Sequence, residues 1–275
     1  MTDLPPAWTC LQPSSVKALL EPPGRVPQAI RLTPDRVPVE AALQVPMVIA
    51  ARLLLGLAVE KDGLVLTPAG ALKRADVWHV FDRTEWPGYD KAATLAMNKV
   101  INEDDAYGVL FTRIVLQAAR LLRKRSGVLK ASKAGKAMLA SEAAPALLTA
   151  LFEATFWKVN LQDFDRNPLE FWPQHHMGVI LWSLSVTAHR WSRSAVLTPA
   201  CTIMETIGDP IAPDFPEFAM TTRVLRPLSW LGILESRRSE ERPGSGLDDD
   251  VRKAPLFDQL LGFEVELKGG SEARH

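Results

Sequence analysis

The sequence is poor in cysteine, with only Cys10 and Cys201 among its 275 residues. Two thiols so far apart provide neither a disulfide framework nor a cysteine-based zinc site. Long apolar runs are lacking too: the longest, residues 48–58, is interrupted by Arg52, whereas a membrane-spanning helix needs about 20 apolar residues. The first six residues do not have the basic and apolar regions of a signal peptide. We therefore expect a soluble, cytoplasmic protein without membrane contact.

The sequence also lacks an excess of either charge, because 32 basic residues balance 32 acidic ones and the net charge is zero. A nucleic-acid-binding protein usually carries a basic excess, since much of its affinity comes from neutralising phosphates. The balance lowers the expectation of nucleic-acid binding without excluding it, because a local basic patch is sufficient. With 47% apolar and 23% charged residues, the composition is that of a folded chain long enough for two domains.

Recognisable catalytic motifs are missing. The sequence has no G-x-S-x-G nucleophile elbow, no G-x-x-x-x-G-K-[ST] phosphate loop and no H-E-x-x-H zinc helix. We predict a non-enzymatic protein that uses no cofactor and no metal. An enzyme stays open only with a site assembled from scattered residues.

Proline is abundant at the start of the chain, with eight in residues 1–39. Proline removes a backbone donor and biases the preceding residue towards extended geometry. We therefore predict a proline-rich extended arm, irregular or polyproline-like, that either covers the folded body or links to an upstream part. At the other end, residues 266–275 are predicted to be a flexible tail.

Between these ends, apolar residues recur at the three-to-four spacing of amphipathic helices. Pro46 and Pro227 should kink or split two of the helices. The segments with this spacing are residues 40–58, 68–82, 89–101, 104–119, 133–157, 174–192, 200–207 and 214–230.

A four-residue motif occurs twice, as Leu66-Thr67-Pro68-Ala69 and as Leu197-Thr198-Pro199-Ala200. In both copies we expect a short strand that leads into a threonine cap and a proline at the first helical position. Basic hairpin-like segments follow each copy. The first is residues 121–130 with a Ser126-Gly127 turn, and the second is residues 232–253 with a polar tip.

Helix, short strand, helix, helix and two-stranded wing is the element order of a winged helix. The sequence therefore predicts a mainly α fold with small β-hairpin wings, arranged as two tandem winged-helix-like units from an internal duplication. The predicted organisation is unit 1 at residues 40–132 with a helical insertion at 83–103, a connecting helix and loop at 133–173, and unit 2 at 174–265.

The stretch from Leu64 to Leu139 resembles a bacterial family. The resemblance rests on the strand and turn of Leu66-Thr67-Pro68-Ala69-Gly70 and on the basic hairpin of residues 120–136. The stretch is similar to tandem winged-helix-like bacterial proteins of unknown function, specifically to the C-terminal region of some plasmid pRi ORF-like proteins. The resemblance extends over most of residues 40–265 and implies no catalytic residues. The proline-rich arm differs from the upstream domain usual in those proteins.

Basic side chains gather around the first hairpin without an acidic residue between them. In a winged helix, the helix before the wing enters the major groove and the wing follows the phosphate backbone. We therefore predict duplex DNA as a partner, with Thr112, Arg113 and Gln117 able to read base edges. The predicted nucleic-acid-binding residues are Arg113, Arg120, Arg123, Lys124, Arg125, Lys130, Lys133 and Lys136.

Two alternatives to DNA binding stay open. The same surfaces suit a partner protein or self-association, and the basic residues also fit a solvated face balanced by Glu103, Asp104 and Asp105. The second unit favours a protein-contacting or merely soluble wing, because acidic residues dilute its basic ones. These basic residues are Arg223, Arg226, Arg237, Arg238 and Arg242.

His175 and His176 follow Asp163, Asp165 and Glu170 in an aromatic loop, which is a possible metal-ligand set. Adjacent histidines on a helix diverge by about 100°, so they seldom converge on one ion. We predict that the pair marks a helix start. The tryptophans are expected to lie in the core.

Overall fold

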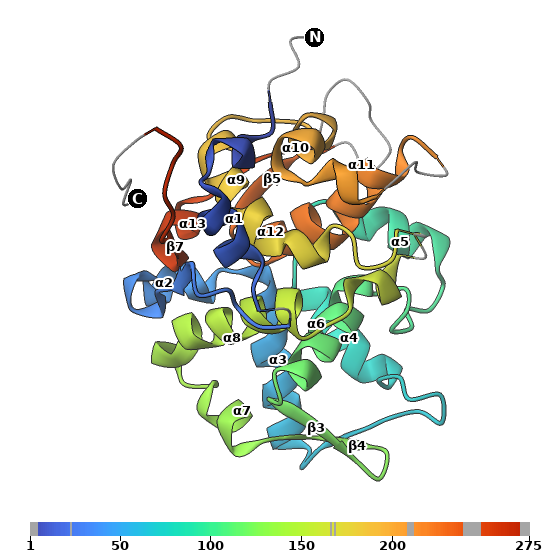
Figure 1. Cartoon of the computed structure of the whole chain (residues 1–275). Coiled ribbons are helices and arrows are strands. Elements are labelled where there is room, and N and C mark those ends of the chain that lie inside the picture. Colours follow the sequence, from blue (N-terminus) through green and yellow to red (C-terminus); the bar gives the residue numbers. More distant parts are fainter. Residues whose placement is uncertain are drawn as a thin grey trace. The chain divides into compact units, whose positions relative to one another are not determined.

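The computed structural model describes residues 5–22, 24–165, 167, 169–207, 212–238 and 249–269. Contacts divide the chain into two compact units, which we describe separately. The central unit is Val37–Val159, and the terminal unit combines Met1–Arg36 with Asn160–His275. Figure 1 shows the elements of both in the colours of the sequence.

The central unit is a helical core with one small sheet. The longest helix, α3, packs against α4, α6 and α8, and its buried Leu54 and Leu55 lie in the core with Phe111 of α6 and Leu151 of α8. The elements are α2 (Val39–Leu43), α3 (Pro46–Glu60), β2 (Leu64–Val65), α4 (Arg74–Arg83), α5 (Lys91–Met97), α6 (Tyr107–Ala118), β3 (Leu122–Arg125), β4 (Val128–Ala131), α7 (Lys133–Ala137), η3 (Ser141–Ala143) and α8 (Ala144–Trp157).

The sheet of the central unit has the antiparallel order β2-β4-β3. Its strands pair Leu64 with Leu129 and Leu129 with Lys124, so β4 lies in the middle. The Ser126-Gly127 turn has positive φ at both residues, 49° and 76°, which is the conformation of a two-residue type I′ hairpin. The predicted hairpin and its turn are therefore confirmed.

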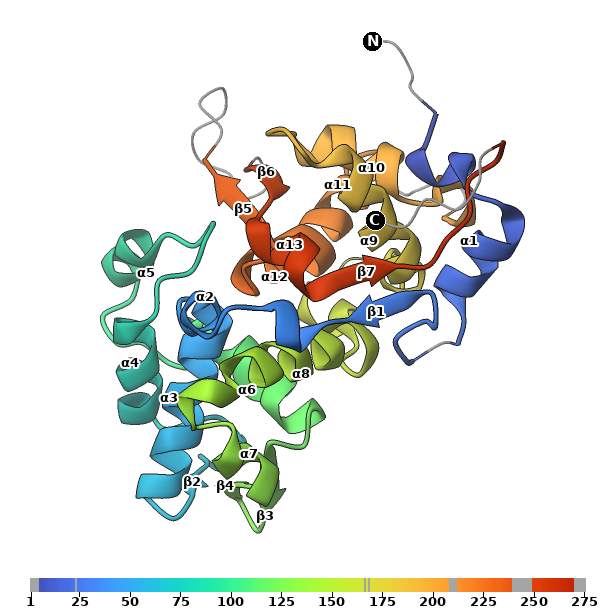
Figure 2. The ribbon, with the colours of Figure 1, turned by 90° about the vertical axis from the view of Figure 1, so that its left-hand side faces the viewer.

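The terminal unit joins the two ends of the chain. Strand β1 from the start pairs antiparallel with β7 from the end, and Figure 2 shows the blue and red strands side by side. The elements are η1 (Ala7–Cys10), α1 (Pro13–Leu20), β1 (Ile30–Leu32), η2 (Pro34–Arg36), η4 (Leu161–Phe164), η5 (Gln174–His176), α9 (Met177–Thr187), α10 (Ser194–Cys201), η6 (Met204–Thr206), α11 (Phe215–Met220), the π-helix η7 (Thr221–Leu225), α12 (Arg226–Trp230), β5 (Leu234–Arg237), β6 (Asp250–Lys253), α13 (Pro255–Leu260) and β7 (Leu261–Phe263).

Strands β5 and β6 form the second hairpin, and an isolated bridge between Ser192 and Val251 adds one residue beside β6. The polar tip predicted between them falls largely in residues 239–248, outside the described residues. Most of the predicted tail, residues 270–275, lies outside them as well. None of the described helices is long and apolar enough to cross a membrane.

The mainly α architecture with small antiparallel sheets is confirmed. Pro46 splits the first predicted helix as expected, because it begins α3 after the short α2. Pro227 does not break the helical run from α11 to α12, where it lies in the first turn of α12 behind a π-helical turn. The helix predicted at residues 200–207 is wrong, because α10 ends at Cys201.

The repeated motif does not form the same structure twice. In the first copy, Thr67 closes a turn by accepting from the Ala71 amide at 3.1 Å, and α4 begins only at Arg74. In the second copy, the threonine and Pro199 lie inside α10. The predicted cap and proline position are therefore wrong in both copies. In the second copy, burial of Leu197 and Cys201 on α10 overrides the local signal.

The first 39 residues are not an irregular arm throughout. Pro13 begins α1, since the first turn of a helix tolerates a missing donor, and buried Leu19 anchors that helix against α9. The approach is close: a Cβ on Gly178 of α9 would lie 2.1 Å from the Leu19 carbonyl oxygen. Apolar anchors among the prolines are the reason for the difference from the prediction.

Candidate nucleic-acid interface

The β3–β4 hairpin separates an apolar face from a basic one. Side chains alternate across a strand, so Leu122 and Leu129 point to the core, where both are buried. Arg123, Arg125 and Lys130 lie on the opposite face and are exposed. The alternation of apolar and basic residues therefore builds a basic outer face on a sheet that is anchored underneath.

Arg123 of β3 and Lys130 of β4 are direct cross-strand partners. Like charges in this position destabilise a sheet, so folding alone does not favour the pair. The Lys130 ammonium donates to the Asp62 carboxylate at 3.0 Å, and this bond and charge lower the pKa of that carboxyl. In the described part of the chain, Arg123 and Arg125 have no carboxylate partner.

Four more predicted residues lie in or next to the hairpin and are exposed. Lys124 shares the face of Leu129 at the tip, and its Nζ lies 3.8 Å from the position that a Cβ on Gly70 would take. Lys133 and Lys136 lie on α7, which Ser132 caps by accepting from the Gly135 amide at 3.0 Å. Arg120 precedes β3 with a positive φ of 60°. We call these four residues, together with Arg123, Arg125 and Lys130, the basic hairpin cluster.

Arg113 does not belong to this cluster. Its guanidinium forms a two-point ion pair with Glu103, with Nη2 and Oε2 3.1 Å apart, and the two side chains are 12% and 1% exposed. Arg113 also donates to Gln117, and Thr112 is fully buried with its hydroxyl donating to the Gly108 carbonyl. Residues of α6 are buried or half-buried along its whole length. The three side chains expected to read base edges are thus not displayed together on the surface.

Neighbouring helices explain the position of α6. It packs against α3, α4 and α8, so most of its circumference is covered within the central unit. Helical periodicity revealed the apolar side of α6 but not the packing of α8 on it. The sequence indicated Glu103 as one of the acidic residues that balance the basic ones, but not its pairing with Arg113, because Glu103 lies outside the helix and ten residues away.

The second hairpin uses its arginines internally. Arg237 and Arg252 cover the Trp191 ring at 4.6 and 4.5 Å from its centroid. Arg237 also pairs with Asp250 at 3.0 Å, and Arg252 with Glu235. These cations are therefore engaged with an aromatic ring and with carboxylates, which distinguishes this hairpin from the first. Arg242 lies outside the described residues.

Arg223, predicted as part of the basic surface of the second unit, is instead buried. Its guanidinium binds the Asp165 carboxylate through Nε–Oδ2 at 2.7 Å and Nη2–Oδ1 at 2.8 Å. It also donates to the carbonyls of Asn167 and Leu169, which fixes the loop after η4. The side chains are 1% and 3% exposed, so the pair holds the terminal unit together.

The same pair explains the loop before the histidines. Asp165 is engaged with Arg223, while His175 and His176 lie on η5 directly before α9, with ring centroids 3.9 Å apart. His176 is buried, and both burial and the nearby His175 lower its pKa to about 4. In the described ranges, no group of three or more His, Cys, Asp or Glu side chains is placed to hold a metal ion.

The basic hairpin cluster lies in a segment with recognisable relatives. Residues 43–144 match the Y4jL N-terminal domain family. That match contains α3 to α7 and therefore the whole basic hairpin cluster. The family is described as an N-terminal domain, whereas the sequence suggested the C-terminal region of plasmid pRi ORF-like proteins. The resemblance to those proteins stays a prediction.

A relative of the same type is "Uncharacterized protein y4jL" from Sinorhizobium fredii (strain NBRC 101917 / NGR234), which is 32% identical to this chain over 110 residues. The aligned part is 40% of this chain and 49% of the relative, so the chain covers about half the length of that protein. The comparison with solved structures found no match.

Proposed function

We propose that the protein binds duplex DNA without catalysing a reaction, and that the basic hairpin cluster contacts the phosphate backbone. The observation that carries the proposal is the outer face of the hairpin, where Arg123 stands directly opposite Lys130 and beside Arg125. A like-charge pair on an exposed strand face is unfavourable in the free protein and favourable beside a row of phosphates.

The proposed contact does not read sequence. Arg113 is held by Glu103 and Thr112 is buried, so α6 offers little to base edges. Phosphate contacts position a protein on DNA but carry no sequence information by themselves. We therefore expect weak, salt-dependent binding, with dissociation constants of about 10⁻⁴–10⁻⁶ M at physiological salt, typical of non-specific complexes.

The element order supports a tandem winged-helix-like arrangement as part of this proposal. The central unit runs α3, β2, α4, α6, β3 and β4, with β4 in the middle of the sheet. The terminal unit runs α9, the Ser192 bridge, α10, the α11–α12 run, β5 and β6, with β6 in the middle. In this interpretation the first wing meets phosphates, while the helix before it stays packed.

The test is a triple charge reversal, Arg123→Glu, Lys124→Glu and Arg125→Glu, measured by fluorescence anisotropy with a labelled random duplex at low ionic strength. The three positions are exposed, so their side chains lie outside the buried core. We expect affinity to fall by at least about tenfold, because three phosphate contacts become repulsive.

A matched control reverses three exposed lysines elsewhere, Lys17→Glu, Lys99→Glu and Lys158→Glu, with the same change in net charge. If the effect comes from the cluster, the control keeps most of the affinity of the wild type. Equal losses in both variants, or no binding by the wild type, would refute the proposal.

A partner protein is the second candidate, favoured by apolar residues on the predicted insertion. Leu95, Met97 and Val100 are 41%, 78% and 47% exposed. Exposed apolar residues that form a contiguous patch mark protein contacts, and these three lie within six positions of the sequence. Self-association through them predicts that Met97→Asp lowers the sedimentation coefficient of the protein at high concentration and leaves DNA binding unchanged. A wild type that is monomeric at every concentration contradicts self-association.

A further inference from the structure

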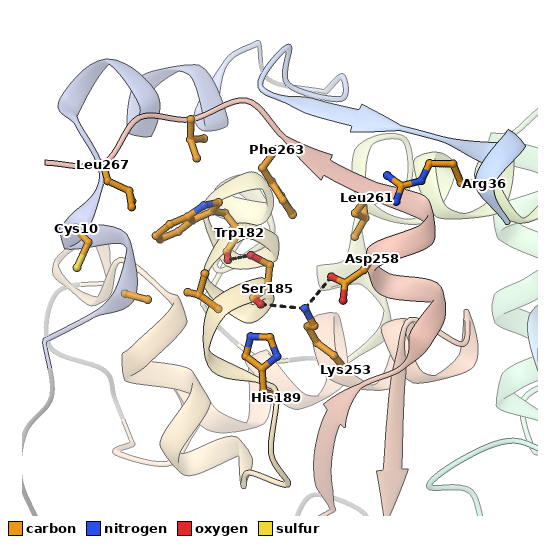
Figure 3. A pocket seen from close by; sticks show the side chains of 13 residues that line it. Cys10, Arg36, Trp182, Ser185, His189, Lys253, Asp258, Leu261, Phe263 and Leu267 are labelled. Carbon is orange, nitrogen blue, oxygen red and sulfur yellow. Dashed lines mark hydrogen bonds and ion pairs between the residues drawn. The ribbon is translucent and has the colours of Figure 1, made fainter. Parts of the chain in front are cut away.

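The terminal unit contains a pocket of about 630 Å³, shown in Figure 3. It lies beside α9, which contributes Trp182 and Val186, and beside β7 and the segment after it, which contribute Phe263 and Leu267. Small-molecule pockets occupy about 300–1,000 Å³, whereas close-packed interiors leave few voids larger than a water molecule. The space is therefore of ligand size and is not a packing defect.

The strap over the pocket is held from both ends of the chain. β7 pairs with β1, and beyond it Leu267 bridges to Leu11 next to η1. The Lys268 amide also donates to the Cys10 carbonyl at 2.8 Å. These bonds fix the wall that carries Phe263 and Leu267, so the pocket is preformed.

Apolar side chains line most of the pocket, and charged groups gather in one part of it. Lys253 donates from Nζ to the Asp258 carboxylate at 2.7 Å and to the Ser185 carbonyl at 3.1 Å. These two bonds are drawn in Figure 3, where Arg36 is the other labelled cation and His189 is drawn to the left of the lysine. The charged lining residues are two cations, Lys253 and Arg36, and one carboxylate, Asp258.

The ion pair with Asp258 neutralises the charge of Lys253 only partly. The lysine side chain is 10% exposed, whereas that of Asp258 is 67% exposed and thus shielded by water. The Lys253 ammonium has three donors, and the described residues accept from it in two hydrogen bonds. It also lies 5.2 Å from the centroid of the Phe257 ring, which attracts the cation but accepts no conventional hydrogen bond. An anionic group in the pocket would complete its charge and its hydrogen bonding.

We propose that this pocket binds a small amphipathic anion, with an aromatic or alkyl body against Trp182 and Phe263 and an acidic head at Lys253. The site lies outside residues 43–144 and does not depend on the proposed DNA contact. It gives the terminal unit a role in ligand binding.

The test uses the whole chain of residues 1–275 and anilinonaphthalene sulfonate, an apolar anion whose fluorescence rises in apolar sites. We expect saturable binding of one equivalent and displacement by octanoate but not by octylamine. Val186→Phe fills the pocket from an exposed position and should weaken binding by at least about tenfold, because added bulk excludes the probe. Val196→Phe is the control, since Val196 is exposed on α10 and does not line the pocket.

The role of Lys253 is tested with Lys253→Met and with N-phenylnaphthylamine, which is the same ring system without the sulfonate. We expect the variant to bind the sulfonate about tenfold more weakly and the neutral probe as before, because a charge-assisted bond is lost. Absence of saturable binding, equal effects of the two valine variants, or equal loss of both probes in Lys253→Met would overturn the proposal.

Cys10 provides a measurement that needs no substitution in the pocket. It is exposed and lines the pocket, whereas Cys201 is buried and its pKa is raised to about 12 by burial, so only Cys10 should react with dithiobis(nitrobenzoate) at neutral pH. Octanoate should slow this reaction in proportion to the occupancy measured with the probe. A reaction rate that stays constant at saturating octanoate would count against the site.

Discussion

Replacing a glycine with alanine should have opposite effects on stability at two positions of the central unit, Gly135 and Gly56. A Cβ on Gly135 of α7 would lie 2.3 Å from the Leu121 carbonyl oxygen, whereas a Cβ on Gly56 of α3 would meet nothing within 4 Å. The first glycine therefore permits the close approach of α7 to the start of the hairpin. The second only adds backbone entropy to the unfolded chain.

We expect Gly135→Ala to lower the free energy of unfolding by about 1–3 kcal/mol, because backbone atoms must move. Gly56→Ala should raise it by about 0.5–1 kcal/mol. Urea unfolding followed by circular dichroism measures both. A Gly135→Ala protein as stable as the wild type would show that α7 does not pack on the hairpin in this way.

His176 makes stability depend on pH. An unfolded chain protonates this histidine below about pH 6.5. The folded chain does so only near its pKa of about 4, which burial and the charge of His175 lower. The unfolded state thus binds more protons between these values, and stability falls as the pH drops from about 6.5 to 4.

The His176→Phe variant should have a flatter dependence of unfolding free energy on pH in this window. The difference in slope from the wild type is at most about 1.4 kcal/mol per pH unit. Urea titrations at several pH values measure the slope of the unfolding free energy against pH. This slope is compared between the two proteins whatever their absolute stabilities. Identical slopes would contradict the lowered pKa, because His176 would then bind protons equally in the folded and the unfolded chain.

At the scale of elements, α6 is a packed core helix and does not act as a reading helix. Arg113→Met should cost about 3–5 kcal/mol of stability, because Glu103 would remain buried without its cation. Adding Glu103→Gln removes that charge and keeps the acceptor for the Leu72 amide, so the double variant should recover most of the loss. Thermal unfolding and DNA titration of the double variant are the measurements.

We expect the double variant to bind random duplex DNA as the wild type does. A loss of DNA affinity in this folded double variant would instead assign Arg113 to the interface. The comparison separates the contribution of α6 from that of the hairpin.

Local signals were sufficient for some elements and not for others. The Ser126-Gly127 turn, between the extended segments that begin at Leu122 and end at Lys130, specifies the hairpin within ten residues, so the sequence predicts it. The buried position of Arg113 depends on its ion pair with Glu103 and on the packing of α8 against α6. The helical conformation of Thr198 and Pro199 depends on the burial of α10. These are tertiary effects that a local pattern does not contain.

At the scale of the whole molecule, the zero net charge conceals an uneven distribution. The basic hairpin cluster gathers cations on the central unit, whereas the arginines of the second hairpin are engaged with Trp191 and carboxylates. The pocket of the terminal unit could not be predicted either, because it joins residues from both ends of the chain through the β1–β7 pairing. Each unit therefore carries its own candidate binding surface.

The most direct test of the DNA proposal is the salt dependence of binding. The logarithm of the association constant of the wild type with random duplex DNA is measured against the logarithm of salt concentration. Each phosphate contact contributes about 0.9 to the steepness of this line, so reversal of Arg123, Lys124 and Arg125 should flatten it by about 3. The Lys17, Lys99 and Lys158 control should keep the wild-type slope. An unchanged slope in the hairpin variant would contradict the proposed interface.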